Sequence, residues 1–301
     1  MWLLYGNHLK HIQINLLKGR HGNLVVRSLA SLYNETQQNL QKEFAKYKGG
    51  SVDLEKDEAS GIAVILLNNP SKKNAMTGKM MSDLDDAVKE LEDWRNGKGV
   101  ILMGAEKSFC SGGDKSTVLQ INTPLMGRLM SQYMHDITMR LFNIPLISVA
   151  AIKGFAIGGG AELATACDFR IMTAASKIGF VQKTVGLATG WGGGTRLVRL
   201  IGRTSALKLL SSGKVLDAES AKSIGLADEI IQEECDIVLE AKKWLSGYCD
   251  GNAQVIQSAK SIVAEAAESN MAMSLDHERN VFSNLWGQDD MGPFKGNIKH
   301  K

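Results

Sequence analysis

The chain has 301 residues, of which 44% are hydrophobic and 22% charged, and its formal net charge is +3 at neutral pH. That length and hydrophobic content allow a large core in one enlarged domain or two small ones. The small net charge gives no reason to expect a nucleic-acid or membrane partner, and no apolar run is long enough to predict a membrane-spanning helix.

Residues 1–50 are expected to form an N-terminal tail outside the fold. Residues 1–34 contain no Asp or Glu but carry several basic side chains. Such a start is typical either of a mitochondrial presequence or of an unstructured tail. Residues 38–57 are polar and charged, and a helix or linker is expected there before the first strand.

Residues 51–200 show the alternation of strand and helix patterns that predicts an α/β core. Short apolar runs predict buried strands, and apolar residues at helical spacing, such as Met80, Leu84 and Val88, predict amphipathic helices. The expected strands span residues 61–69, 99–105, 145–154 and 168–174, and the expected helices span residues 77–94 and 129–142.

Residues 201–301 are expected to form a helical C-terminal subdomain, because strand patterns disappear after about residue 200. The four cysteines have no CxxC or zinc spacing, which predicts reduced, packed thiols, an intracellular compartment and no metal site. His135 and His277 lie on predicted helices without a partner motif, so a structural role is favoured over a catalytic one for both. No GxSxG, Walker A or GxGxxG motif is present.

Two of the predicted strands end in glycine-rich loops, "EKSFCSGGDK" and "FAIGGGAELATAC". Glycines after a strand let backbone N–H groups face a pocket without an intervening side chain, and two such groups aimed at one oxygen form an oxyanion hole. Glu162, in the second loop, is the candidate chemical group. The alternatives are a tight turn for the glycines and a favourable helix-dipole position for Glu162.

With the motifs "NNPSKKNAM", "FCSGGDK", "GFAIGGGAELATACDFRIMT" and "GWGGGTRLVRLIG", the chain resembles the crotonase (enoyl-CoA hydratase/isomerase) superfamily. The resemblance implies a crotonase-type ββα spiral followed by a helical region that assembles trimers, often paired into hexamers. It also implies an acyl-CoA thioester substrate, no separate cofactor, and an oxyanion hole formed by the N–H groups of Gly113 and Gly159.

The resemblance further implies where coenzyme A binds. Lys72 and Lys73 are expected near the CoA phosphates or adenine, with simple solvation as the alternative for two lysines in a loop. Ala75, Ser111 and Asp114 complete the expected CoA-binding set.

Enoyl-CoA hydratases of this superfamily use two glutamates, and Glu162 matches the first. Aligning the chain on Lys177 and Gly186 puts Gln182 at the second. An amide cannot act as a carboxylate acid or base, so hydration is disfavoured. The chain most resembles members that convert ethylmalonyl-CoA to butyryl-CoA and CO2, and methylmalonyl-CoA to propionyl-CoA more weakly, as metabolite proofreading.

The implied reaction passes through a thioester enolate. Glu162 is expected either to protonate the α-carbon, which is the favoured role, or to repel the departing carboxylate as an anion. Gln182 would orient the substrate carboxylate or serve as a structural amide, and Trp191 and Phe155 would line an apolar acyl pocket or pack in the core.

The sequence is also compatible with two other functions. A hydratase or isomerase that uses Glu162 alone is one alternative, and a non-catalytic acyl-CoA- or RNA-binding homologue is another. The resemblance favours the cytosol, while the acid-poor leader favours the mitochondrial matrix.

Overall fold

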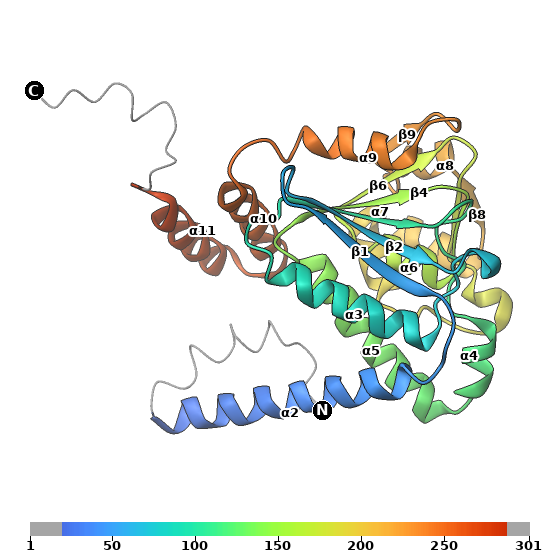
Figure 1. Ribbon diagram of the computed structural model, residues 1–301, viewed down its shortest axis with the longest axis horizontal. Coiled ribbons are helices and arrows are strands. Elements are labelled where there is room, and N and C mark those ends of the chain that lie inside the picture. The colour runs from blue at the N-terminus through green and yellow to red at the C-terminus, as the bar shows by residue number, and fades with distance from the viewer. Residues whose placement is uncertain (1–19, 288–301) are drawn as a thin grey trace, which may run out of the picture.

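The computed structural model describes residues 20–287 (Figure 1). Expectations for residues 1–19 and 288–301 fall outside the described residues. The chain folds around a six-stranded sheet of order β1-β2-β3-β4-β6-β9, in which β1 is antiparallel to β2 and the other neighbours are parallel. Its strands are β1 (Ser51–Asp57), β2 (Ile62–Asn68), β3 (Gly99–Gly104), β4 (Ile147–Ile152), β6 (Phe169–Thr173) and β9 (Glu229–Ile231).

A second, three-stranded sheet of order β5-β7-β8 lies beside the first. It consists of β5 (Phe155–Ile157), β7 (Lys177–Gly179) and β8 (Val215–Asp217). Strand β5 leaves β4 after only two residues, so the chain passes directly from the large sheet into the small one. The helix that follows β5 therefore starts at the junction of the two sheets.

Both faces of the large sheet are buried, as expected for parallel strands with continuous apolar sequences. In β2, Ala63, Ile65 and Leu67 pack in one core cluster, whereas Ile62 and Val64 pack in another. Helices α3 (Gly78–Glu92) and α5 (Pro124–Asn143) cover the first face, and α9 (Ile237–Ser246) covers the second (Figure 1).

Short helices connect these layers, and α10 and α11 extend away from the sheet (Figure 1). Helix α10 is attached by Lys260, whose ammonium donates to Leu146 O at 2.6 Å and to Asp168 Oδ2 at 2.7 Å. The remaining elements are η1 (Pro70–Lys72), α4 (Lys115–Gln120), α6 (Gly159–Ala164), η2 (Gln182–Val185), α7 (Gly193–Ser212), α8 (Ala218–Ser223), α10 (Ala253–Glu268) and α11 (Met271–Leu285).

The structure confirms every strand and helix expected between residues 61 and 174, with boundaries that differ by a few residues. The four cysteines are free, and three of them are buried. Burial raises the pKa of the Cys110 and Cys167 thiols to about 12, so these two thiols stay protonated at neutral pH.

Three expectations differ from the structure. Helix α2 (Arg20–Phe44) is not outside the fold, because Leu40 and Phe44 are buried in the core against α3 and α5. Residues 51–57 form the strand β1. Strands do not end near residue 200, because β8 and β9 follow α7, and β9 joins the large sheet.

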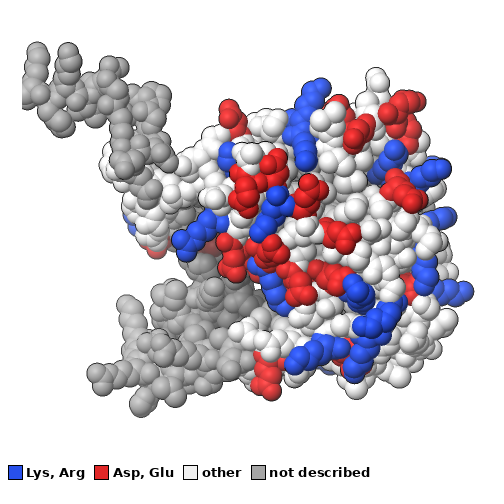
Figure 2. Space-filling model, in the orientation of Figure 1, with Lys and Arg blue, Asp and Glu red and all other residues white. Residues whose placement is uncertain are grey.

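The described surface carries charges of both signs. On the face shown in Figure 2, Lys and Arg side chains are interspersed with Asp and Glu side chains. Among residues 20–287, no helix combines the length and apolar character needed to cross a bilayer.

Candidate active site

Backbone pairing holds the two glycine-rich loops side by side. Met76 N donates to Gly112 O at 2.8 Å, and Asp114 N donates to Met76 O at 2.8 Å. Earlier in the same loop, Cys110 is bridged in parallel to Ala156 of β5. The loop after β3 is thus sandwiched between the motif after β2 and the start of the loop after β4.

The N–H groups of Gly113 and Gly159 come close together at this junction. Because Gly112 and Asp114 make the hydrogen bonds to Met76, the Gly113 N–H points away from Met76. A Cβ added to Gly112 would lie 3.1 Å from Gly159 N, so the Gly113 and Gly159 nitrogens lie within about 7 Å of each other. Within residues 20–287 neither nitrogen donates a hydrogen bond.

Close packing explains why the loop after β5 needs consecutive glycines. A Cβ on Gly160 would lie 2.1 Å from Cys110 O, and a Cβ on Gly159 would lie 2.6 Å from Cζ3 of Trp191. Real Cβ atoms do not approach other atoms so closely. Glycine therefore lets the first turn of α6 touch both the neighbouring loop and the Trp191 ring.

Glu162 is buried in the first turn of α6, with an exposed fraction of 2%. Its Oε1 accepts hydrogen bonds from Gln182 Nε2 at 2.8 Å and Gly190 N at 3.2 Å. Its Oε2 accepts from Trp191 N at 2.8 Å and Gly193 N at 3.0 Å. Three of the four donors are backbone N–H groups, so both Glu162 oxygens are positioned as hydrogen-bond acceptors.

Gln182 lies beside Glu162, as the sequence alignment on Lys177 and Gly186 predicted. Because the Glu162 carboxylate only accepts, the Gln182 side chain has to present its NH2 group to it. The remaining amide atom, Gln182 Oε1, is buried and has no hydrogen-bond partner among the described residues. The NH2 group carries a second N–H beside the one on Glu162, so the orienting role of Gln182 toward a substrate carboxylate stays a prediction.

Arg196, in the first turn of α7, hydrogen-bonds the backbone of Glu162. It is 4% exposed, and burial lowers its pKa to about 10, against the opposing effect of Glu162. Its guanidinium donates to Glu162 O at 3.1 Å and Trp191 O at 2.8 Å, and also to the hydroxyl groups of Thr138 and Thr165. These contacts tie α5, α6 and α7 together around the carboxylate.

The expected CoA-binding residues also gather at the paired loops. Lys72 Nζ donates to Asp114 Oδ2 at 2.8 Å, and Ser111 N donates to Lys73 O at 3.0 Å. Burial alone would raise the pKa of Asp114, but hydrogen bonds led by the one from Lys72 outweigh it and lower the pKa to about 2. Ala75 is buried between these loops.

Lys73 and Phe155 meet at the rim of the site. The Lys73 ammonium lies 5.8 Å from the centroid of the Phe155 ring, a cation–π arrangement. Phe155 is 43% exposed, so it lies at the rim rather than in the core.

Sequence reasoning missed the residues that hold Glu162 in place. Arg196, Thr138 and Gly193 had no assigned role, although two of them lie in the quoted motif "GWGGGTRLVRLIG". Gly193 packs directly on the glutamate, since a Cβ there would lie 2.5 Å from Glu162 Cβ. The signal available was the triple glycine after Trp191, which resembles the one before Glu162.

The two histidines considered in the sequence take structural positions. The His277 ring nitrogen is hydrogen-bonded to Ser261 Oγ at 2.8 Å, which links α11 to α10. His135 lies on α5, and its Cδ2 would contact a Cβ on Gly192 at 3.5 Å. Neither contacts Glu162 or the two unpaired amides through a hydrogen bond within the described residues.

The fold and this site define the class of protein. The chain belongs to the enoyl-CoA hydratase/isomerase family, whose model matches residues 57–300. Two solved structures confirm the crotonase fold. An enoyl-CoA hydratase from Thermoplasma volcanium has a TM-score of 0.71 and 28% identity, covering 79% of this chain and 93% of its own. One from Bacillus anthracis has a TM-score of 0.73 and 25% identity, covering 81% and 93%.

Within that family, relatives named ethylmalonyl-CoA decarboxylase are similar over most of the chain. The Xenopus laevis protein is 44% identical over 262 residues, which cover 85% of this chain and 87% of the relative. The Gallus gallus protein is 43% identical over 279 residues, covering 91% and 93%. The Homo sapiens protein is 41% identical over 263 residues, covering 85% of each.

Proposed function

We propose that this protein is a carboxy-lyase that decarboxylates ethylmalonyl-CoA to butyryl-CoA and CO2, and methylmalonyl-CoA to propionyl-CoA more weakly. Relatives of that name, more than 40% identical over most of the chain, support the substrate. Two unpaired backbone amides next to a buried carboxylate support the reaction. Removal of such malonyl-type thioesters would be a proofreading step in acyl-CoA metabolism.

The N–H groups of Gly113 and Gly159 act as the oxyanion hole. When the bond between the α-carbon and the carboxylate breaks, its electron pair moves into an enolate whose charge collects on the thioester oxygen. Two amide donors hold that oxygen more tightly in the transition state than in the ground state, which lowers the barrier. CO2 leaves, and a proton from solvent then completes the α-carbon. The thioester itself is the electron sink, so this route requires no metal or further cofactor.

Glu162 fits the second of its two expected roles better than the first. Four donors surround its oxygens, so it enters the reaction as an anion rather than as the proton donor. A fixed negative charge near a second carboxylate raises the ground-state energy of that carboxylate and favours its departure as neutral CO2.

Coenzyme A binds along the paired loops. Lys72 and Lys73 supply positive charge there, and Lys72 is half exposed despite its contact with Asp114. We place the phosphates of CoA at these two side chains and the pantetheine chain along the backbone of Ala75 and Ser111.

The assembly is a homotrimer, or a hexamer of two trimers, in the cytosol. The C-terminal helices support this part of the proposal, because α10 and α11 expose Val263, Met271 and Phe282 at 70%, 74% and 58%. Burial of such side chains between subunits would be favourable. Analytical ultracentrifugation of the purified protein tests the assembly, with a monomer as the contrary result, and cell fractionation tests the compartment.

The decisive experiment offers the purified protein several thioesters. Ethylmalonyl-CoA is expected to yield CO2 and butyryl-CoA in equal amounts, methylmalonyl-CoA is expected to react more slowly, and crotonyl-CoA is expected to remain unhydrated. Hydration of crotonyl-CoA without CO2 release from either malonyl-type ester would show a hydratase instead.

A further inference from the structure

The Trp191 side chain carries a polar group that the described contacts do not use. Only 4% of the residue is exposed, yet within the described part of the chain its indole N–H donates no hydrogen bond. The buried Trp94 is different, because its N–H donates to Glu58 Oε1 at 2.9 Å. Among the described side chains, Gln37 Oε1 and Gln182 Oε1 are the polar atoms that have neither solvent contact nor a hydrogen-bond partner. Trp191 Nε1 also has no partner but does not belong to this group, so it is in contact with solvent-accessible space.

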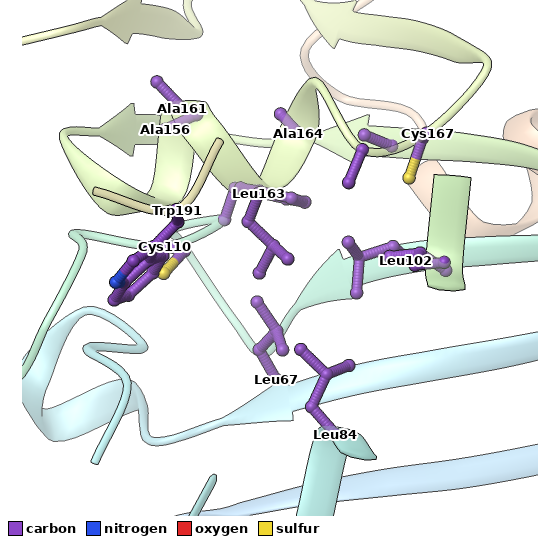
Figure 3. Close-up of a cluster of buried hydrophobic side chains, with 14 of the residues drawn as sticks. Leu67, Leu84, Leu102, Cys110, Ala156, Ala161, Leu163, Ala164, Cys167 and Trp191 are labelled. Carbon is purple, nitrogen blue, oxygen red and sulfur yellow. The ribbon is translucent and has the colours of Figure 1, made fainter. Parts of the chain in front are cut away.

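The indole ring lies against the two glycines that carry the unpaired amides. A Cβ on Gly159 would lie within 2.8 Å of three ring carbons, and a Cβ on Gly113 would lie 3.8 Å from Cζ2. Cζ2 is bonded to the carbon that carries Nε1, so the N–H edge of the ring faces the Gly113 side. Figure 3 shows the nitrogen at the end of the ring that is turned away from Leu163 and Leu67.

The backbone of Trp191 is fixed on both sides. Its N–H donates to Glu162 Oε2 at 2.8 Å. Its carbonyl accepts from Thr138 Oγ1 at 3.0 Å and from Arg196 at 2.8 Å. A ring held by these bonds and packed on Gly159 is a preorganised binding element, which has little conformational freedom to lose when a ligand binds.

Two charged donors near this point already have protein partners. The Arg196 guanidinium contacts carbonyl and hydroxyl oxygens of the protein, and Lys72 contacts Asp114. Gln182 donates one N–H of its amide to Glu162 and has an acceptor oxygen without a partner. A substrate carboxylate accepts hydrogen bonds only, and the indole N–H is a side-chain donor beside the two glycines that has no protein partner among the described residues.

We propose that the indole N–H of Trp191 binds the free carboxylate of the malonyl-type thioester and thereby distinguishes it from acyl thioesters that lack this group. This inference rests on the proposed decarboxylation. With the thioester oxygen between Gly113 and Gly159, the carboxylate on the adjacent α-carbon comes next to the ring that covers both glycines.

A neutral donor suits a carboxylate that has to leave as CO2. A lysine or arginine would stabilise the negative charge in the ground state and lose that interaction as neutral CO2 forms, which would raise the barrier. The indole N–H orients the carboxylate with a weaker interaction, and this leaves more of the binding energy for the enolate oxygen.

The test compares Trp191→Phe with the wild-type protein. Phenylalanine keeps an aromatic ring and the backbone contacts but removes the N–H. The kcat/KM for ethylmalonyl-CoA is expected to fall about tenfold or more, as for loss of one hydrogen bond to a charged group. The inhibition constant of butyryl-CoA, which has no carboxylate, is expected to change less than about threefold. Trp94→Phe is the matched control, and we expect it to leave both values unchanged.

The outcomes separate this inference from the proposed function. A parallel loss of substrate turnover and butyryl-CoA binding, or no change in either, would overturn the role of Trp191. If the wild-type protein releases no CO2 from ethylmalonyl-CoA, the proposed function fails and this inference falls with it. Should Trp191→Phe not fold, Trp191→Leu takes its place, because it also removes the indole N–H and introduces no other donor.

Discussion

Replacement of Glu162 with glutamine tests the hydrogen-bond arrangement on which the site depends. The variant keeps the shape of the side chain but replaces one acceptor oxygen with a donor NH2 group. At the Trp191 and Gly193 end, an amide oxygen can still accept both N–H groups, which lie at 2.8 and 3.0 Å. At the other end, the new NH2 group faces Gly190 N, which lies 3.2 Å from Oε1 in the native protein.

The cost of Glu162→Gln follows from these contacts. Gln182 can rotate its amide and accept from the new NH2 group, but a backbone N–H has no such freedom. An unpaired buried donor costs about 1–3 kcal/mol. The neighbouring Arg196, buried and stabilised by the charge of Glu162, also loses its compensating anion, which adds to the cost. We expect the free energy of unfolding to fall by about 3 kcal/mol in all, a large part of the roughly 5–15 kcal/mol typical of a domain.

Two assays check this prediction. Urea unfolding measures the stability change, and CO2 release measures turnover, which we expect to fall at least about tenfold because the fixed negative charge is lost. Binding of butyryl-CoA is expected to stay nearly intact, since other residues supply the two amides. The double variant Glu162→Gln/Gln182→Glu restores a carboxylate–amide pair and should recover part of the stability. Unchanged stability and turnover in the single variant would refute the reasoning.

Three further substitutions follow from the same structure. Gly159→Ala forces a methyl group into the adjacent indole ring, so CO2 release is expected to fall about a hundredfold or more. Gln182→Glu places a second carboxylate within hydrogen-bond distance of the first, so one of the two takes up a proton. Decarboxylation should then fall and weak hydration of crotonyl-CoA should appear in a spectrophotometric assay. Asp136→Asn removes a carboxyl whose pKa burial raises to about 6. Denaturation curves should show this variant to be more stable than the wild type by about 2–3 kcal/mol above pH 6.

Each of these substitutions has its own control. Gly127→Ala places a methyl group in open space on helix α5 and should leave activity unchanged, so equal losses at both glycines would contradict the packing argument. For Gln182→Glu, a pH-independent rate with no hydration would contradict the expected coupling of two carboxylates. The stability gain of Asp136→Asn should shrink as the pH falls below 6 and disappear below about pH 3, where the native carboxyl is protonated whether the chain is folded or unfolded. A constant gain at all pH values would exclude ionisation as its cause.

Apolar periodicity was enough to predict the central strands and helices. It was not enough for β1, whose burial alternates irregularly because Asp53, Glu55 and Lys56 lie on an edge strand. Helix α2 was expected only from residue 38, as a helix or linker, for a similar reason. Most of its residues are polar, and its apolar stripe is short. Leu40 and Phe44, four residues apart, form that stripe and are buried in the core.

The chemistry of the site was partly readable. The nine-residue spacing between Lys177 and Gly186 placed Gln182 beside Glu162, and the glycine motifs placed the two amides. The acceptor role of both Glu162 oxygens was not readable, because it depends on backbone donors from residues 190–193 that sequence alone does not orient. The hydrogen bonds from Arg196 to carbonyl oxygens were not readable either, because they depend on how three helices pack together.

Main-chain bridges pair the loops, Met76 with Gly113 and Cys110 with Ala156. This pairing lets stabilisation of the enolate and recognition of the thioester evolve separately. The two amides proposed to hold the reacting oxygen are main-chain atoms, so they are inherited with the path of the polypeptide, which itself requires glycine at positions 159 and 160. Exposed side chains beside them, such as Phe155, can therefore change and adapt the protein to a new thioester while its capacity to stabilise an enolate is preserved.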